Sequence, residues 1–155
     1  MQQKLFNYSE DKIKTLLPRL AMIEDVDEIQ NLLTTFSFVH KASIKQNIEN
    51  ERIVVIGDIN NVVGVIIINA YHNTISDMII NQNYRGNKFA QKLFNFMIDK
   101  NNINGLIIKA TYKPYSSIGF WESLGFKITG KIYQKKGTMQ LMEMVWFRYN
   151  EVIIK

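Results

Sequence analysis

The sequence predicts an α/β (α+β) fold: a mixed, mostly antiparallel sheet of about seven strands with helices on both faces. Three observations predict it. Two runs rich in Val and Ile flank a turn of Asp and Asn at residues 58–61, which is typical of a β-hairpin. An amphipathic helical pattern begins at Phe89, and a second pair of strand-like runs follows it. The predicted order is β-α-α-β-β-β-α-β-α-β-β, which implies one parallel step in the middle of the sheet.

Length and composition indicate one globular domain. The chain has 155 residues, so we expect a single domain over residues 1–155, with 1–15 as a candidate N-terminal extension. Cys is absent and His40 and His72 are the only histidines, which argues against a disulfide framework, a cysteine nucleophile and a metal site. No apolar run is long enough to span a bilayer and the N-terminus lacks a signal-peptide core, so we expect a cytoplasmic protein.

The first third of the chain predicts one strand and two helices. Leu16 to Ala21 is typical of a short strand, and Pro18 favours a sheet edge or the start of a strand because it cannot donate to the ladder. Asp25 with Glu28 three residues on resembles a capping box, so we expect a helix to start there. Apolar side chains then recur at helical spacing, namely Val26, Ile29, Leu32, Leu33 and Phe36. A second, shorter helix is expected over Lys41 to Glu49.

Three consecutive strands are expected next, over Arg52 to Gly57, Val62 to Ala70 and Asn73 to Ile80. The first two form the hairpin. Their apolar residues are nearly continuous rather than alternating, so we expect both faces of this part of the sheet to be covered.

The amphipathic helix that follows has an apolar stripe typical of a core-facing helix. The stripe consists of Phe89, Ala90, Leu93, Phe94, Met97 and Ile98. A strand over Leu106 to Thr111 comes after this helix. The helix connects the strand that ends at Ile80 to the strand over Leu106 to Thr111. Because this connection is a helical crossover, the two strands should lie parallel to each other.

The last part of the chain predicts a helix and a hairpin. The helix covers Tyr115 to Leu124, and Gly125 is expected to end it in a left-handed conformation with Phe126 packed against it. Strands over Phe126 to Tyr133 and Thr138 to Phe147 then form the final hairpin.

The stretch from Ile80 to Leu93 joins a strand end, a basic glycine turn and a helix start. The first N–H groups of a helix have no partner within it, and the helix dipole adds partial positive charge there. Arg85 and Lys88 add two formal charges beside Gly86. This stretch therefore predicts a phosphate or pyrophosphate site. A capped helix with a solvated first turn is the alternative.

Two motifs and their spacing carry a resemblance to a known family. Arg85 to Ala90 resembles the acetyl-CoA motif of the GCN5-related N-acetyltransferase (GNAT) superfamily: Gln or Arg, two residues, Gly, one residue, then Gly or Ala. The motif's central glycine is Lys88 here, where a left-handed backbone would strain a lysine. Gly119 to Phe126 resembles the family's aromatic-Glu-x-Leu-Gly-Phe signature, and Asp77 to Ile80 resembles the strand before the motif.

The resemblance implies a GNAT-like fold and transfer of the acetyl group of acetyl-CoA, the cosubstrate, to a primary amine. It implies that the main chain of Met78, Ile79 and Ile80 holds the pantetheine arm and the thioester oxygen. The residues implied to hold the pyrophosphate are Arg85, Gly86, Asn87, Lys88, Phe89 and Ala90. Ser117 is a further candidate to bond CoA, and Trp121 stands where the family often has a tyrosine.

The catalytic residues are assigned with alternatives. Asp77 lies at the family's acidic position, which makes it the candidate general base, while His72 and a water relay are the alternatives. An indole N–H cannot act as a general acid at neutral pH. Tyr112 and Tyr115 are therefore the candidate acids for the leaving thiolate, with Tyr133 or water as alternatives.

The expected acceptor is an amine of a small molecule or peptide, with neither nucleic acid nor membrane as a partner. The net charge of +5 either serves solubility or attracts a polyanion, which could be CoA or nucleic acid. The basic residues are scattered and form no dense tract of the kind that favours nucleic acid. Phe36, Phe38 and His40 are candidate walls of the acceptor pocket, with core packing as the alternative for the two phenylalanines. A homodimer is left open. The alternative function is a catalytically inactive GNAT fold that binds acyl-CoA or a partner.

Overall fold

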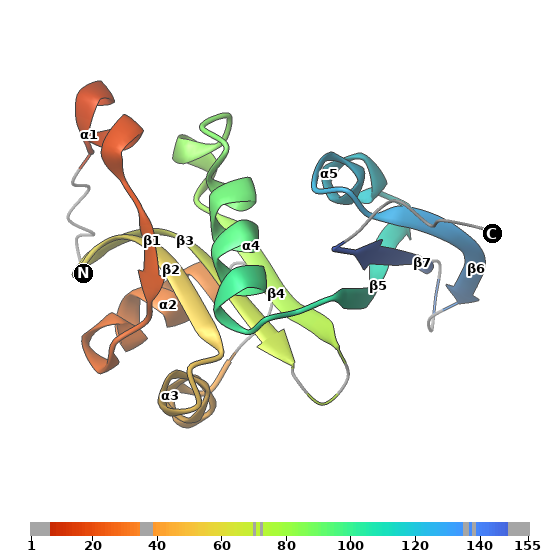
Figure 1. Ribbon diagram of the computed structural model, residues 1–155, viewed down its shortest axis with the longest axis horizontal. Helices are drawn as coiled ribbons and strands as arrows, with labels where there is room; N and C mark the ends of the chain where they lie inside the picture. The colour runs from red at the N-terminus through yellow and green to blue at the C-terminus, as the bar shows by residue number, and fades with distance from the viewer. Residues whose placement is uncertain are drawn as a thin grey trace. The chain divides into compact units, whose positions relative to one another are not determined.

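The computed structural model describes residues 7–34, 39–69, 71, 73–134, 137 and 139–148. The chain divides into two compact units (Figure 1). The first unit comprises Met1–Ile68 and Ser76–Met97, and the second comprises Asn69–Ile75 and Ile98–Lys155. The expected residues Phe36, Phe38 and His72 lie outside the described part of the chain.

A four-stranded sheet is the scaffold of the first unit. Its order is β1-β2-β3-β4, with bounds Pro18–Leu20, Ile53–Asp58, Asn61–Asn69 and Thr74–Ile80. β2 pairs antiparallel with both β1 and β3. The predicted hairpin is therefore confirmed, as is the position of the Pro18 strand at an edge of this sheet.

A β-bulge interrupts the β2–β3 hairpin near its turn. Ile56 lies opposite Gly64 but Gly57 lies opposite Val62, so Val63 is the extra residue. The bulge reverses the alternation of β3, and Val62 thereby joins the same core cluster as Val65. A side chain at Gly57, where φ is 120°, would place its Cβ 2.4 Å from the carbonyl oxygen of Asn61, so only glycine fits.

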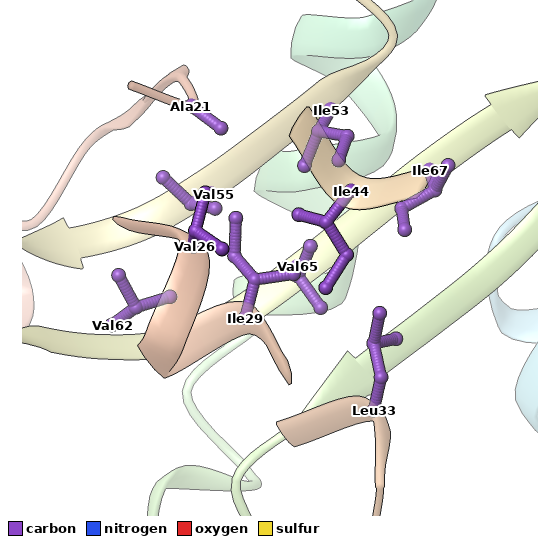
Figure 2. Close-up of a cluster of buried hydrophobic side chains, with 10 residues drawn as sticks. All are labelled: Ala21, Val26, Ile29, Leu33, Ile44, Ile53, Val55, Val62, Val65 and Ile67. Carbon is purple, nitrogen blue, oxygen red and sulfur yellow. The ribbon is translucent and has the colours of Figure 1, made fainter. Parts of the chain in front are cut away.

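Two helices cover one face of this sheet, α2 (Val26–Leu33) and α3 (Lys41–Glu49). Figure 2 shows their apolar side chains pointing at alternate residues of β2 and β3. The cluster consists of Ala21, Val26, Ile29, Leu33, Ile44, Ile53, Val55, Val62, Val65 and Ile67. Because a one-residue slip would turn the strand residues away from the helices, this burial fixes the register of the hairpin.

The helix α4 (Phe89–Lys100) begins in the first unit and covers the opposite face. A Cβ built on Gly64 would lie 3.0 Å from Ile56 Cγ2 and 3.1 Å from Leu93 Cδ1, so α4 packs directly over β3 at this glycine. Phe89, Phe94, Met97 and Ile98 of the stripe are buried as well, and Ala90 is half-buried. Both faces of the β2–β3 hairpin are thus covered, as its continuous apolar runs predicted.

The N-terminal segment holds a short helix that the sequence did not predict, α1 (Glu10–Thr15). Ser9 caps it, since its hydroxyl accepts the N–H of Lys12 at 3.2 Å. The predicted capping box at Asp25 was wrong, because the Asp25 side chain makes no capping bond to α2, although α2 does start directly after Asp25. The carboxylate of Asp25 accepts the N–H of Met22 at 2.8 Å and is held by Arg19.

A three-stranded sheet is the scaffold of the second unit. Its order is β5-β7-β6, with bounds Gly105–Lys113, Gln140–Phe147 and Lys127–Gln134, and both pairings are antiparallel. Alternate residues form one buried face, namely Leu106, Ile108, Ala110, Met142 and Met144. Met142 and Met144 are therefore core residues of this unit.

The helix α5 (Ile118–Ser123) is shorter at its start than the predicted Tyr115 to Leu124. Its end confirms the prediction. Gly125 has φ 98°, and the N–H of Phe126 donates to the carbonyl of Trp121 at 3.1 Å, as in a Schellman motif. The ring of Phe126 meets the ring of Trp121 edge to face with centroids 5.4 Å apart, which supplies the hydrophobic contact.

The element order confirms the predicted β-α-α-β-β-β-α-β-α-β-β, preceded by α1. In the part of the chain that the structure describes, seven strands form one sheet of four and one of three. The parallel step between β4 and β5 stays a prediction, because these strands lie mainly in different units. Within the described residues, no helix is long and apolar enough to cross a membrane.

Candidate functional site

The loop between β4 and α4 is the centre of the candidate site, and all of it belongs to the first unit. It begins at Asn81, whose N–H donates to the carbonyl of Val63 in β3 at 2.7 Å. The side chain of Asn81 then accepts the N–H of Asn83 at 2.9 Å, an Asx turn that starts the short 3₁₀ helix η2 (Gln82–Tyr84). The sheet therefore fixes where the loop starts.

Side chains within the loop hold its fold. Asn87 Nδ2 donates to the carbonyl of Tyr84 at 2.9 Å, and Arg85 Nε donates to the carbonyl of Ile80 at 3.4 Å. These bonds close the loop on itself, and both use side-chain donors rather than main-chain N–H groups. From Arg85 to Lys88 the residues are exposed.

Two residues of the loop have left-handed backbone. Gly86 has φ 88° and Lys88 has φ 61°. A Cβ on Gly86 would meet no atom within 4 Å, so this position requires glycine for its conformation rather than for space. Lys88, in contrast, carries the strain that the motif's glycine avoids, of about 1–2 kcal/mol. The expected strain at Lys88 is present.

The start of α4 supplies N–H groups. The first intrahelical bond runs from the N–H of Lys92 to the carbonyl of Lys88 at 3.1 Å, so the N–H groups of Phe89, Ala90 and Gln91 lie in the turn that a helix leaves without carbonyl partners. Phe89 is buried at 2% exposure and anchors this turn in the core. With the charges of Arg85 and Lys88 beside it, the turn fits an anionic diphosphate.

The end of β4 lies directly before this loop. Asp77, Met78, Ile79 and Ile80 are all half-buried. Burial raises the pKa of the Asp77 carboxyl, because desolvation disfavours its charged form. A carboxylate with a raised pKa is a better proton acceptor than an ordinary one, which suits a general base.

The remaining candidates lie in the second unit. Tyr112 is half-buried at the end of β5, and Tyr115 is 85% exposed. The hydroxyl of Ser117 accepts from Thr111 Oγ1 at 2.9 Å and donates to the carbonyl of Thr111 at 3.2 Å, so it joins the start of α5 to β5. Trp121 is half-buried and packs between Phe120 and Phe126.

The alternative acid Tyr133 belongs to a charged cluster on the three-stranded sheet. Its hydroxyl donates to Glu143 Oε2 at 3.0 Å, while Lys109 Nζ lies 4.1 Å from its ring centroid. Lys131 Nζ lies 5.0 Å from the same centroid, and its hydrogen bond to Tyr133 raises the pKa of Lys131. Tyr133 therefore donates to Glu143 in this structure.

The structure thus brings two groups of predicted residues together. The first unit holds Asp77, Met78, Ile79, Ile80 and the six loop residues from Arg85 to Ala90. The second unit holds Tyr112, Tyr115, Ser117 and Trp121. His40 lies at the start of α3, where its carbonyl accepts the N–H groups of Ser43 and Ile44.

Sequence reasoning missed the contacts that support the loop, including the bond from the Asn87 side chain to Tyr84, although Asn87 itself was among the predicted pyrophosphate residues. Asn81 and Asn87 had a usable signal, since Asn after a strand and in a glycine turn favours side-chain-to-backbone bonding. Tyr8 and Tyr84 had none, because their contact joins segments 76 positions apart in the chain.

Comparison with known proteins agrees with this geometry. The family model described as an acetyltransferase (GNAT) domain matches residues 7–146. No curated protein matches the chain by sequence.

Solved structures share the fold at low identity. A variant of spermidine N-acetyltransferase SpeG from Vibrio cholerae is 18% identical with a TM-score of 0.64, covering 86% of this chain and 94% of that one. The ribosomal-protein-alanine N-acetyltransferase of Brucella melitensis is 18% identical with a TM-score of 0.68, covering 85% and 99%. The protein yncA of Salmonella typhimurium, solved with its cofactor acetyl-CoA, is 14% identical with a TM-score of 0.67, covering 91% and 98%.

Proposed function

The chain belongs to the GNAT acetyltransferase family, and from this we propose that it transfers the acetyl group of acetyl-CoA to a primary amine of a small molecule or peptide. The observation that carries the proposal is the loop from Arg85 to Ala90, in which left-handed backbone at Gly86 and Lys88 leads into the N–H groups of a helix start anchored by the buried Phe89. Acetyl-CoA is the cosubstrate of the family.

The binding roles follow from position. The main chain from Arg85 to Ala90 holds the diphosphate through N–H groups, with the guanidinium and ammonium of Arg85 and Lys88 adding charge. The main chain of Met78 to Ile80 holds the amide groups of the pantetheine arm and the thioester oxygen, because a strand end offers peptide groups in the spacing that such an arm matches. Ser117 and Trp121 are proposed as further contacts to CoA.

The chemistry needs one proton acceptor and one proton donor. The acceptor ammonium first loses one proton to become a nucleophilic amine. The amine nitrogen then forms a bond to the thioester carbonyl carbon as the carbon–sulfur bond breaks, the nitrogen loses a second proton, and one proton reaches the sulfur, so that one proton is released overall. Asp77 is proposed to take the proton of the acceptor ammonium, directly or through water, and its half-buried position supports this. Tyr112 or Tyr115 is proposed as the donor to the sulfur, with Tyr133 and water as alternatives.

The acceptor is an amine whose identity calls for a direct screen. Polyamines and protein N-termini are the first classes to include, because spermidine and ribosomal-protein alanine are acceptors named for two proteins of the same fold. A cytoplasmic location and a homodimer stay predictions of the sequence.

Calorimetry with CoA followed by a thiol-release assay tests the proposal. We expect CoA to bind and thiol release from acetyl-CoA to require an added amine; the panel would contain spermidine, aminoglycosides, amino acids, and peptides with free N-terminal and lysine amines. CoA binding with no turnover across this panel would instead favour the catalytically inactive alternative. No heat of binding at millimolar CoA would reject both.

A further inference from the structure

Tyr8 lies where three segments of the first unit meet. Its hydroxyl accepts the N–H of Asp58 at 2.7 Å and donates to the carbonyl of Asn61 at 2.6 Å. One hydroxyl therefore bridges both ends of the β2–β3 turn. Burial raises the pKa of the Tyr8 phenol above its usual 10.0, so the group stays protonated and able to donate.

The same residue reaches the loop before α4. The N–H of Tyr8 donates to Tyr84 Oη at 3.2 Å, and the two rings meet edge to face with centroids 6.0 Å apart. Tyr84 is 6% exposed and directly precedes Arg85. The hairpin turn thus holds Tyr8, and Tyr8 in turn holds Tyr84.

Tyr84 controls both sides of the loop. Its N–H donates to the carbonyl of Asn81 at 2.9 Å, and its own carbonyl accepts Asn87 Nδ2 at 2.9 Å. Any displacement of Tyr84 therefore displaces the residues from Arg85 to Lys88. This segment includes both left-handed residues, Gly86 and Lys88.

The strain at Lys88 explains why such support is needed. A non-glycine residue in left-handed backbone persists only where its surroundings over-determine the conformation. The N-terminal segment supplies further contacts to the same end of the unit, since Lys92 Nζ donates to the carbonyl of Leu16 at 3.4 Å and Lys12 lies 4.0 Å from Asp58.

We propose that Tyr8 is a positioning residue for CoA: acting through Tyr84, it holds Arg85 to Lys88 in the conformation that presents main-chain N–H groups to the diphosphate. The proposal rests on the proposed function for the identity of the ligand. It makes the segment around Tyr8 a support of the diphosphate loop rather than a dispensable extension.

Hydroxyl deletions test the linkage. Tyr8→Phe and Tyr84→Phe should each weaken CoA binding about threefold to tenfold, the range expected for losing a hydrogen bond that orders the loop. ADP, which carries a diphosphate without the pantetheine arm, should lose affinity by a similar factor. The double variant should bind CoA no more weakly than the single variant with the lower affinity, because both changes break the same chain of contacts. If the fold-losses in CoA affinity of the two single variants multiply in the double variant, the linkage through Tyr84 is overturned.

Amide hydrogen exchange gives a readout that needs no ligand. In Tyr8→Phe, exchange should accelerate at residues 82–91 and stay unchanged in α2 and α3, whose cores are separate from the loop. Tyr71→Phe, at an exposed tyrosine of the second unit, is the matched control and should change neither exchange nor affinity. With an acceptor identified, KM for acetyl-CoA should rise by the same factor while kcat stays constant.

The two proposals fail differently. If the wild-type protein binds no CoA, the proposed function fails, while the exchange experiment still decides whether Tyr8 orders the loop. Unchanged exchange in Tyr8→Phe would overturn the positioning role, as would faster exchange with unaltered CoA affinity.

Discussion

The N–H of Lys92 donates to the carbonyl of Lys88 at 3.1 Å, so α4 begins on a lysine in left-handed backbone. The same residue stands at the central glycine position of the acetyl-CoA motif. Helix initiation and ligand binding therefore place opposite demands on one side chain: the backbone favours glycine, whereas an ammonium is well placed for an anion.

Replacing this lysine by glycine should stabilise the protein. Lys88→Gly relieves strain of about 1–2 kcal/mol but increases the entropy of the unfolded chain, so the free energy of unfolding should rise by about 0.5–1 kcal/mol. Urea unfolding measures it. Lys88→Ala is the matched control, because it removes the ammonium and keeps the strain, and it should bring no gain.

The same pair separates two roles of the ammonium in CoA binding. If Lys88 is merely accommodated, Lys88→Gly should bind CoA as tightly as the wild type or more tightly. If the ammonium contacts a phosphate, both variants should lose affinity together. We expect the second result, because the ammonium of Lys88 is proposed to add charge beside the diphosphate.

A carboxylate in the first turn of α4 should block the site. Ala90→Glu adds bulk and negative charge where the diphosphate is proposed to lie, so CoA affinity should fall by about a hundredfold or more. Asn95→Glu makes the same charge change at an exposed position further along α4 and should leave binding nearly intact. Retained affinity in Ala90→Glu, measured by calorimetry, would contradict the placement of the site.

Asp77 should make stability fall as pH rises. Its pKa in the folded protein lies above the ordinary 3.8, so the folded state binds the proton more tightly than the unfolded chain does. The resulting stabilisation is present below pH 3.8 and is lost as pH rises through the folded pKa. Asp77→Asn lacks this loss, so it should be the more stable protein at neutral pH, with the difference shrinking towards acid. Urea unfolding at several pH values measures both curves.

The same substitution should impair turnover. Without the carboxylate, kcat should fall by about a hundredfold or more if Asp77 is the general base, while CoA affinity stays the same. Ser76→Ala, at the exposed neighbouring residue, is the control. An unchanged kcat in Asp77→Asn would assign the proton transfer to water or to another residue.

The buried ion pair of the first unit should be costly to break. Arg19 donates to both oxygens of Asp25, at 2.7 and 2.9 Å, and Asp25 is fully buried. Asp25→Ala leaves the guanidinium without its partner and should lower the free energy of unfolding by about 3 kcal/mol. Asp27→Ala breaks an exposed pair with Lys41 at 2.7 Å and should have little effect. Equal losses in the free energy of unfolding for the two variants would show that burial does not determine how much these ion pairs contribute to stability.

The sequence predicted most of the fold because its signals are local. The helix over Lys41 to Glu49 agrees at both ends, and Gly125 ends α5 as its left-handed propensity predicted. The loop from Arg85 to Ala90 was recognisable because glycine, charge and helix periodicity fall within a few residues.

Other features depended on contacts between distant segments. Asp25 has the sequence of a helix cap, yet Arg19 binds its carboxylate, and only the fold brings the guanidinium there. The Tyr8–Tyr84 contact likewise follows from the path of the N-terminal segment. A local sequence pattern predicts neither the Arg19–Asp25 pair nor the Tyr8–Tyr84 contact, because each depends on which surfaces pack together.

The Tyr8 hydroxyl binds two main-chain groups, the N–H of Asp58 and the carbonyl of Asn61, rather than any side chain. Substitutions at residues 58–61 would therefore preserve both hydrogen bonds of the Tyr8 hydroxyl, as long as the turn keeps its backbone geometry. An insertion or deletion of a single residue there would move one of the two groups out of reach. Homologues that retain a tyrosine at this position should accordingly vary in the composition of the turn but not in its length.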